Sequence, residues 1–120
     1  MKERIKKLRS KLDEEEVNAL LINNPQNRQY LTAFTGTAGV VLISDNSAQL
    51  ITDFRYTEQA EDEATDFEIV EQGDNKLETI NRLLQEEGIE KLGIEAQGIS
   101  YRKYLQYQKE LDVELVATTD

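Results

Sequence analysis

The stretch VVLISDNSAQLIT at residues 40–52 provides the framework of the predicted fold. Its two apolar runs, residues 40–43 and 50–52, flank a polar connector at residues 44–47. Two short apolar runs separated by a few turn-forming residues are typical of a β-hairpin. We therefore expect these two segments to be antiparallel neighbours in the central part of a sheet.

Strands and helices alternate on both sides of this hairpin. Short apolar runs bounded by polar residues predict four more strands, at residues 17–22, 67–70, 91–94 and 113–116. Apolar residues three or four positions apart predict amphipathic helices over residues 5–12, 77–84 and 101–111. This alternation predicts an α/β domain, and the hairpin makes its sheet mixed. A length of 120 residues suits one domain, residues 1–120, with about six strands.

Local signals mark the ends of individual helices. Pro25 is expected to open a short helix, with Asn24 as its N-cap. Gly88 is expected to follow the C-terminal end of the second amphipathic helix. A helix over residues 56–64 should be short, because acidic residues gather at its negatively charged C-terminal end.

Composition excludes several classes of function. Acidic residues outnumber basic ones 24 to 14, and this balance argues against a nucleic-acid partner. The sequence has no histidine, so it lacks the usual general base, and no cysteine, so it lacks a thiol nucleophile and the usual nitrogen and sulfur metal ligands. No apolar run approaches the ~20 residues that a membrane span needs. Absence of cysteine is consistent with the cytoplasm, which is the predicted location.

The first predicted helix carries much of the positive charge of the chain. Six of the 14 basic residues lie within the first eleven positions. A basic amphipathic helix can bind an anionic membrane surface. Its apolar stripe is narrow, however, and four acidic residues follow at residues 13–16, so we favour a solvated helix that packs on the sheet.

Several short motifs follow one another at a distinctive spacing. They are Asn27-Arg28, Tyr30-Leu31-Thr32, Phe34-Thr35-Gly36-Thr37-Ala38-Gly39, Thr52-Asp53-Phe54-Arg55-Tyr56 and Gln59-Ala60. In this order, and with the surrounding strands and helices, the whole chain resembles the creatinase/prolidase-type N-terminal domain of Xaa-Pro aminopeptidases and Xaa-Pro dipeptidases. The resemblance implies a ribonuclease-H-like α/β fold. Ala33 and Phe54 depart from many members of the family, which have glycine at these two positions.

The resemblance also implies a division of labour. In the family, this domain precedes a separate catalytic domain of pita-bread fold, which holds two divalent metal ions, commonly manganese or cobalt, and is absent from this chain. Residues 1–120 are therefore expected to be inactive alone and to hold no metal or other cofactor. Their expected partners are the catalytic domain of the same protein, the neighbouring subunit of a homodimer and proline-containing peptides.

Two other functions stay open at this point. The chain can be a free-standing peptide- or protein-binding module derived from such a peptidase. It can also be a hydrolase that uses carboxylates alone, although the absence of histidine weighs against this. A continuation of the reading frame into the metal ligands of a pita-bread domain would favour the peptidase.

Arg55 is the main candidate for substrate binding that the resemblance implies. A guanidinium can clamp a carboxylate or a peptide carbonyl with its planar fork. The alternative for Arg55 is an ordinary surface ion pair, which contributes little to stability. Asp53 is expected either to orient Arg55 or, more commonly for an aspartate before a helix, to act as an N-cap. Tyr56 is expected to pack where that helix begins.

Aromatic residues and glycines before the hairpin have two interpretations each. Phe34 and Tyr30 can form an apolar wall for a proline ring, but burial against the first helix is more common for such residues. Gly36 and Gly39 can present backbone N–H groups to a substrate, or serve only a tight entry into the next strand. The acidic residues within residues 58–63 are interpreted as a solvated helix face rather than a metal site.

Overall fold

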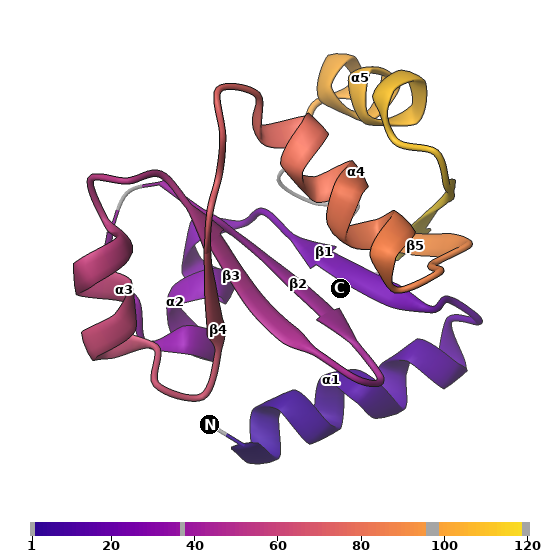
Figure 1. Ribbon diagram of the computed structural model, residues 1–120. Helices are drawn as coiled ribbons and strands as arrows, with labels where there is room; N and C mark the ends of the chain where they lie inside the picture. The colour runs from indigo at the N-terminus through magenta and orange to yellow at the C-terminus, as the bar shows by residue number, and fades with distance from the viewer. Residues whose placement is uncertain (1, 37, 96–98, 119–120) are drawn as a thin grey trace.

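The computed structural model describes residues 2–36, 38–95 and 99–118. Helices and strands alternate along the chain as the sequence predicts (Figure 1). In order, they are α1 (Lys2–Glu14), β1 (Ala19–Ile22), α2 (Pro25–Thr32), β2 (Val40–Ser44), β3 (Ala48–Thr52), α3 (Thr57–Glu63), β4 (Glu68–Glu71), α4 (Lys76–Glu86), β5 (Lys91–Glu95), α5 (Tyr101–Glu110) and β6 (Glu114–Thr118).

The described strands form one mixed sheet in the order β4-β3-β2-β1-β5-β6. The predicted hairpin is confirmed, because β2 and β3 pair in antiparallel fashion with Val41 opposite Leu50. Strand β2 is also antiparallel to β1, whereas the pairs β1–β5, β5–β6 and β3–β4 are parallel. Consequently β1, β3, β4, β5 and β6 all end at the same side of the sheet, where β2 begins. We call this side the carboxyl edge.

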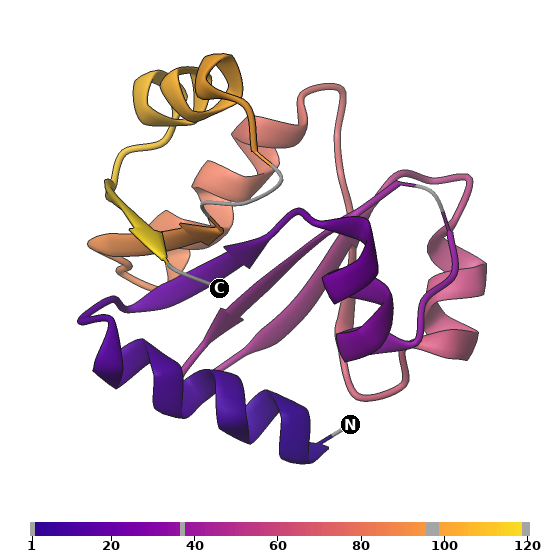
Figure 2. The ribbon, with the colours of Figure 1, turned by 180° about the vertical axis from the view of Figure 1, so that it is seen from behind.

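Helices cover both faces of the sheet, and each face has its own apolar core (Figures 1 and 2). On one face, Leu84 of α4 and Tyr107 of α5 pack against strand residues such as Leu21. On the other face, Ile5 of α1 lies in one cluster with Val41 of β2 and with residues of α2 and α3. The prediction that the first helix packs on the sheet is therefore confirmed. No helix in the described part of the chain is long and apolar enough to cross a membrane.

The helix signals are confirmed where they are local. The side chain of Asn24 accepts hydrogen bonds from the N–H groups of Gln26 and Asn27, so it caps α2 as predicted. Gly88 follows α4 with a φ of 68°, a left-handed conformation that favours glycine. Helix α3 is short, with seven residues. The strand predicted at residues 113–116 extends further, to Thr118.

Candidate functional site

Residues 53–56 form a tight corner between β3 and α3, at the carboxyl edge of the sheet (Figure 1). The N–H of Tyr56 donates a hydrogen bond to the carbonyl oxygen of Asp53 at 3.0 Å, which closes the turn. We call this segment the Asp53–Arg55 corner. In open α/β sheets, ligands commonly bind outside the carboxyl ends of the strands, so this place suits a functional contact.

Asp53 and Arg55 form a two-pronged ion pair. Nε of Arg55 lies 3.1 Å from Oδ1 of Asp53, and Nη2 lies 2.8 Å from Oδ2. The backbone N–H of Arg55 also donates to Oδ1, at 3.0 Å. Hydrogen bonds from the Arg55 side chain lower the pKa of Asp53, and the same bonds raise the pKa of Arg55. The side chain of Arg55 nevertheless remains 63% exposed, so it faces solvent while it is paired with Asp53.

Asp53 does not cap α3, although this was its more common expected role. Tyr56 occupies the N-cap position, and no side chain bonds to the helix there. The carboxylate of Asp53 is instead committed to Arg55, two residues along the chain. Between its two expected roles, the structure therefore favours the orientation of Arg55.

Tyr56 links this corner to the apolar core. The guanidinium carbon of Arg55 lies 5.3 Å from the centre of the Tyr56 ring. On the core side, the rings of Tyr56 and Phe34 meet edge to face, with their centres 6.1 Å apart. The prediction that Tyr56 packs where the helix begins is therefore confirmed.

Phe34 and Gly36 continue this series of contacts inside the domain. Phe34 is fully buried and shares its cluster with Ile5 of α1, as expected for burial against the first helix. Its ring lies against Gly36, where an added Cβ would be 2.2 Å from Cζ of Phe34. The five predicted site residues thus form one series of contacts, which runs from exposed Arg55 to buried Phe34. A ligand can reach the exposed end of this series.

Tyr30 does not follow its expected burial. Its side chain is 64% exposed, and the guanidinium of Arg4 lies over its ring at 3.9 Å.

Phe54, within the corner, is also exposed, at 73%. The corner therefore carries an exposed apolar side chain one position before Arg55 in the sequence.

Arg28 is a structural determinant that the sequence analysis missed. It is buried, and its Nη1 and Nη2 donate to the carbonyl oxygens of Gly39 and Gly36, each at 2.8 Å. Burial lowers the pKa of Arg28. Oγ1 of Thr52 also donates to the carbonyl oxygen of Ala38. The carbonyl oxygens of Gly36, Ala38 and Gly39 therefore bond to side chains of the domain. Through two of these bonds, Arg28 fixes the loop that precedes β2.

Glu95, at the end of β5, is the second residue that was missed. It is buried, and its carboxylate accepts hydrogen bonds from the N–H groups of Asn23 and Asn24, both at 2.9 Å, and from the side chain of Asn27. Glu95 thereby joins the end of β5 to the beginning of α2. A charged residue at the end of an apolar strand is the only signal of this role in the sequence.

Glu63 of α3 is engaged in hydrogen bonds within the domain. Glu63 accepts hydrogen bonds from the N–H of Thr35 at 2.9 Å and from the side chain of Gln59 at 3.2 Å. The backbone bond from Thr35 lowers the pKa of Glu63. Across residues 2–36, 38–95 and 99–118, no three Asp or Glu side chains are grouped so that they could hold a metal ion.

Comparison with known proteins agrees with this architecture. The family model of the creatinase/prolidase N-terminal domain matches residues 4–120. The chain belongs to this family. Over 118 residues it is 37% identical to the peptidase YqhT of Bacillus subtilis. The matched region covers 98% of this chain and 33% of YqhT.

Solved structures show the same fold for this creatinase/prolidase N-terminal domain. An Xaa-Pro dipeptidase from Bacillus anthracis is 42% identical with a TM-score of 0.94, over 98% of this chain and 33% of the dipeptidase. The N-terminal domain of the cytoplasmic peptidase PepQ from Mycobacterium tuberculosis H37Rv is 28% identical with a TM-score of 0.84, over 97% of this chain and 92% of that one. The chain spans about a third of the length of YqhT and of the dipeptidase.

Ala33 shows why glycine suits one position of the family motif. Ala33 follows α2 with a φ of 66° and a ψ of 6°, in the left-handed region. A side chain is unfavourable in this conformation, whereas glycine adopts it without a steric penalty. This creatinase/prolidase N-terminal domain therefore carries backbone strain directly before Phe34.

Proposed function

We propose that this chain acts as the non-catalytic N-terminal domain of an Xaa-Pro peptidase, with the Asp53–Arg55 corner facing the substrate cleft of a catalytic domain. The observation that carries this proposal is the exposed guanidinium of Arg55, which Asp53 holds in place at the carboxyl edge. Family membership supports the substrate class, since the related proteins include an Xaa-Pro dipeptidase.

The chemistry of the corner suits a proline-containing peptide. Asp53 engages Nε and Nη2 of Arg55, and Nη1 is the guanidinium nitrogen that this ion pair does not use. That group can donate to a peptide carbonyl or carboxylate. Phe54, the preceding residue in the sequence, is also exposed and can offer an apolar surface for a proline ring. In this proposal Tyr56, Phe34 and Gly36 keep the corner in position from inside the domain.

The bond cleavage itself belongs to another part of the peptidase. The residues of this chain do not fit a dinuclear metal centre, because the sequence has no histidine and the described acidic residues form no suitable group. Manganese or cobalt would be held by the separate catalytic domain. We further propose that the domain closes the cleft, contributes to homodimer contacts and works in the cytoplasm; the likeness to the N-terminal domain of a cytoplasmic peptidase supports this location.

A chimeric enzyme tests the proposal. This chain would replace the N-terminal third of the Bacillus anthracis Xaa-Pro dipeptidase, which has the same fold at a TM-score of 0.94. In the chimera, Arg55→Ala should lower kcat/KM for an Xaa-Pro dipeptide by roughly tenfold to a thousandfold, with unchanged folding and metal content. Exposed Arg82 of α4 provides the control, and Arg82→Ala should leave the kinetics unchanged. Identical kinetics for both variants would contradict the role of Arg55.

A further inference from the structure

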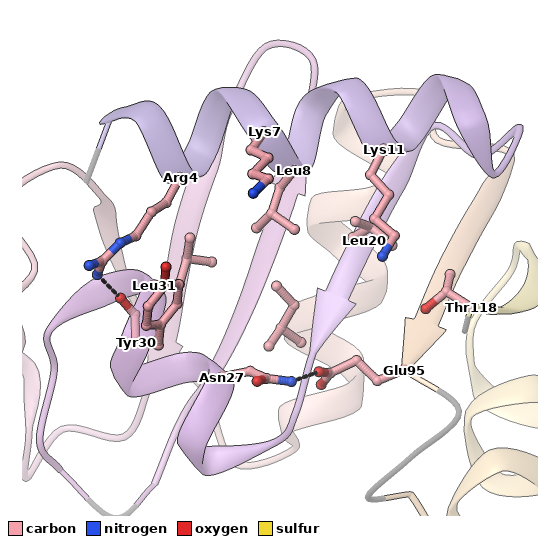
Figure 3. Close-up of a pocket in the computed structure, with 11 residues that line it drawn as sticks. Arg4, Lys7, Leu8, Lys11, Leu20, Asn27, Tyr30, Leu31, Glu95 and Thr118 are labelled. Atoms are coloured by element: carbon pink, nitrogen blue, oxygen red, sulfur yellow. Dashed lines mark hydrogen bonds between the residues drawn. The ribbon is translucent and has the colours of Figure 1, made fainter. Parts of the chain in front are cut away.

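A groove of about 330 Å³ lies between α1 and α2 (Figure 3), and no residue of the Asp53–Arg55 corner lines it. Its floor is apolar and consists of Leu8 of α1, Leu20 and Ile22 of β1, and Leu31 of α2. The volume is at the small end of the range for ligand sites. It suits one or two amino-acid residues rather than a long segment.

One wall of the groove is cationic. Arg4, Lys7 and Lys11 lie on a single face of α1, because they are three and four positions apart. In Figure 3 the side chains of Lys7 and Lys11 point from the helix toward the groove. Arg4 closes one end of the groove by donating a hydrogen bond to the carbonyl oxygen of Tyr30. This concentration of positive charge stands out in a chain with a net charge of −10.

The opposite wall offers hydrogen-bond acceptors. Asn27 donates from Nδ2 to Glu95, so its Oδ1 is directed elsewhere and can accept a hydrogen bond (Figure 3). Oγ1 of Thr118 donates to the carbonyl oxygen of Ile94 at 3.3 Å, and its lone pairs can also accept. A ligand between the two walls therefore meets positive charge on one side, acceptors that include the carboxylate of Glu95 on the other, and apolar side chains beneath.

From this arrangement we propose that the groove binds the carboxyl-terminal end of a peptide. The terminal carboxylate lies beside Lys7, an apolar side chain rests on Leu20 and Ile22, and a peptide N–H donates to the wall that contains Asn27. Three cationic side chains line the groove against the single carboxylate of Glu95, so charge complementarity favours an anionic ligand. The acceptors favour a peptide over a fatty acid, because an alkyl chain has no N–H group to pair with them. This inference does not depend on the proposed peptidase function.

Titration of the isotope-labelled chain with the peptide acetyl-Ala-Leu-Leu tests the proposal by nuclear magnetic resonance. The peptide has no proline, so its binding is separate from the cleavage of Xaa-Pro bonds. Shift changes should centre on Leu8, Leu20 and Asn27. The C-terminal amide of the same peptide should bind about tenfold more weakly, because it lacks the negative charge.

Two neighbouring charge reversals provide a matched pair of variants. Lys7→Glu should weaken binding of the acid about tenfold or more, whereas Lys6→Glu, at an exposed position that does not line the groove, should change it less than about twofold. Circular dichroism would establish that both variants are folded. Equal binding of acid and amide, equal effects of the two variants, or shift changes centred on residues 53–56 would overturn the proposal. Octanoate binding as tightly as the peptide would replace it with a general amphiphile site.

Discussion

The ring of Phe34 occupies the space that a side chain at Gly36 would need, since an added Cβ would lie 2.2 Å from Cζ of Phe34. Phe34 in turn supports Tyr56, whose other side lies near the guanidinium of Arg55. A change at Gly36 would thus displace the packing beneath the Asp53–Arg55 corner. The glycine is needed here for close approach.

We expect Gly36→Ala to lower the free energy of unfolding by about 1–3 kcal/mol, because the new methyl group overpacks a filled core. Chemical denaturation would measure the loss. Gly73→Ala is the control, since the nearest atom to an added Cβ there is Oγ1 of Thr79 at 3.7 Å. Equal midpoints for the two variants would show that the Phe34 ring can move away at little cost.

Arg28→Met should destabilise the domain by about 2–4 kcal/mol. Methionine keeps much of the apolar stem, but it leaves the carbonyl oxygens of Gly36 and Gly39 without their donors. Thermal and urea unfolding would measure the effect. The same substitution at exposed Arg82 should stay within about 0.5 kcal/mol of the original chain. A small effect at Arg28 would mean that water replaces the guanidinium at the loop.

Ala33→Gly should stabilise the domain, in contrast to most substitutions by glycine. Relief of the left-handed strain at φ 66° outweighs the added freedom of the unfolded chain, for a net gain of about 0.5 kcal/mol. Ala117→Gly, at an exposed position of β6, should instead cost about 0.5–1 kcal/mol. Differential scanning calorimetry of the two variants would give opposite shifts in Tm if this account is right.

The features predicted from sequence are those whose causes are local. The hairpin at residues 40–52 follows from two apolar runs and a turn, and the Asn24 cap follows from the residues next to it. Asp53 shows the limit of such reasoning, because both a helix cap and an ion pair are local options. Only the folded geometry decides between them, because it brings three hydrogen-bond donors of Arg55 to the carboxylate of Asp53.

Features that depend on distant partners could not be predicted in this way. Glu95 bonds to Asn24, 71 positions earlier in the chain, and this contact exists only because β5 lies beside β1. Tyr30 was expected to be buried, but its ring contacts the charged group of Arg4 and remains exposed. Nothing in the residues around Tyr30 indicates that α1 places a cation, rather than an apolar side chain, above it.

Acid should release the Asp53–Arg55 ion pair only well below neutral pH. Hydrogen bonds from Arg55 lower the pKa of Asp53 below its unfolded value of about 3.9. The contribution of the pair is therefore complete above that value and is lost as the pH falls through the lower, folded pKa. A carboxyl-carbon resonance titration of Asp53 would follow this change. In Arg55→Ala the midpoint should return toward the ordinary aspartate range, and an unchanged midpoint would show that the pair does not persist in solution.

Conservative variants of the same pair can separate its geometry from its charge in the chimeric dipeptidase. Arg55→Lys should recover only part of the kcat/KM that Arg55→Ala loses, because lysine keeps the charge but not the two-pronged contact with Asp53. Asp53→Asn should lower kcat/KM by roughly threefold to thirtyfold, since it leaves Arg55 charged but less firmly oriented. Steady-state kinetics with an Xaa-Pro dipeptide would measure both. Full activity of Asp53→Asn would show that Arg55 needs no orientation, and full activity of Arg55→Lys would reduce its role to a general positive charge.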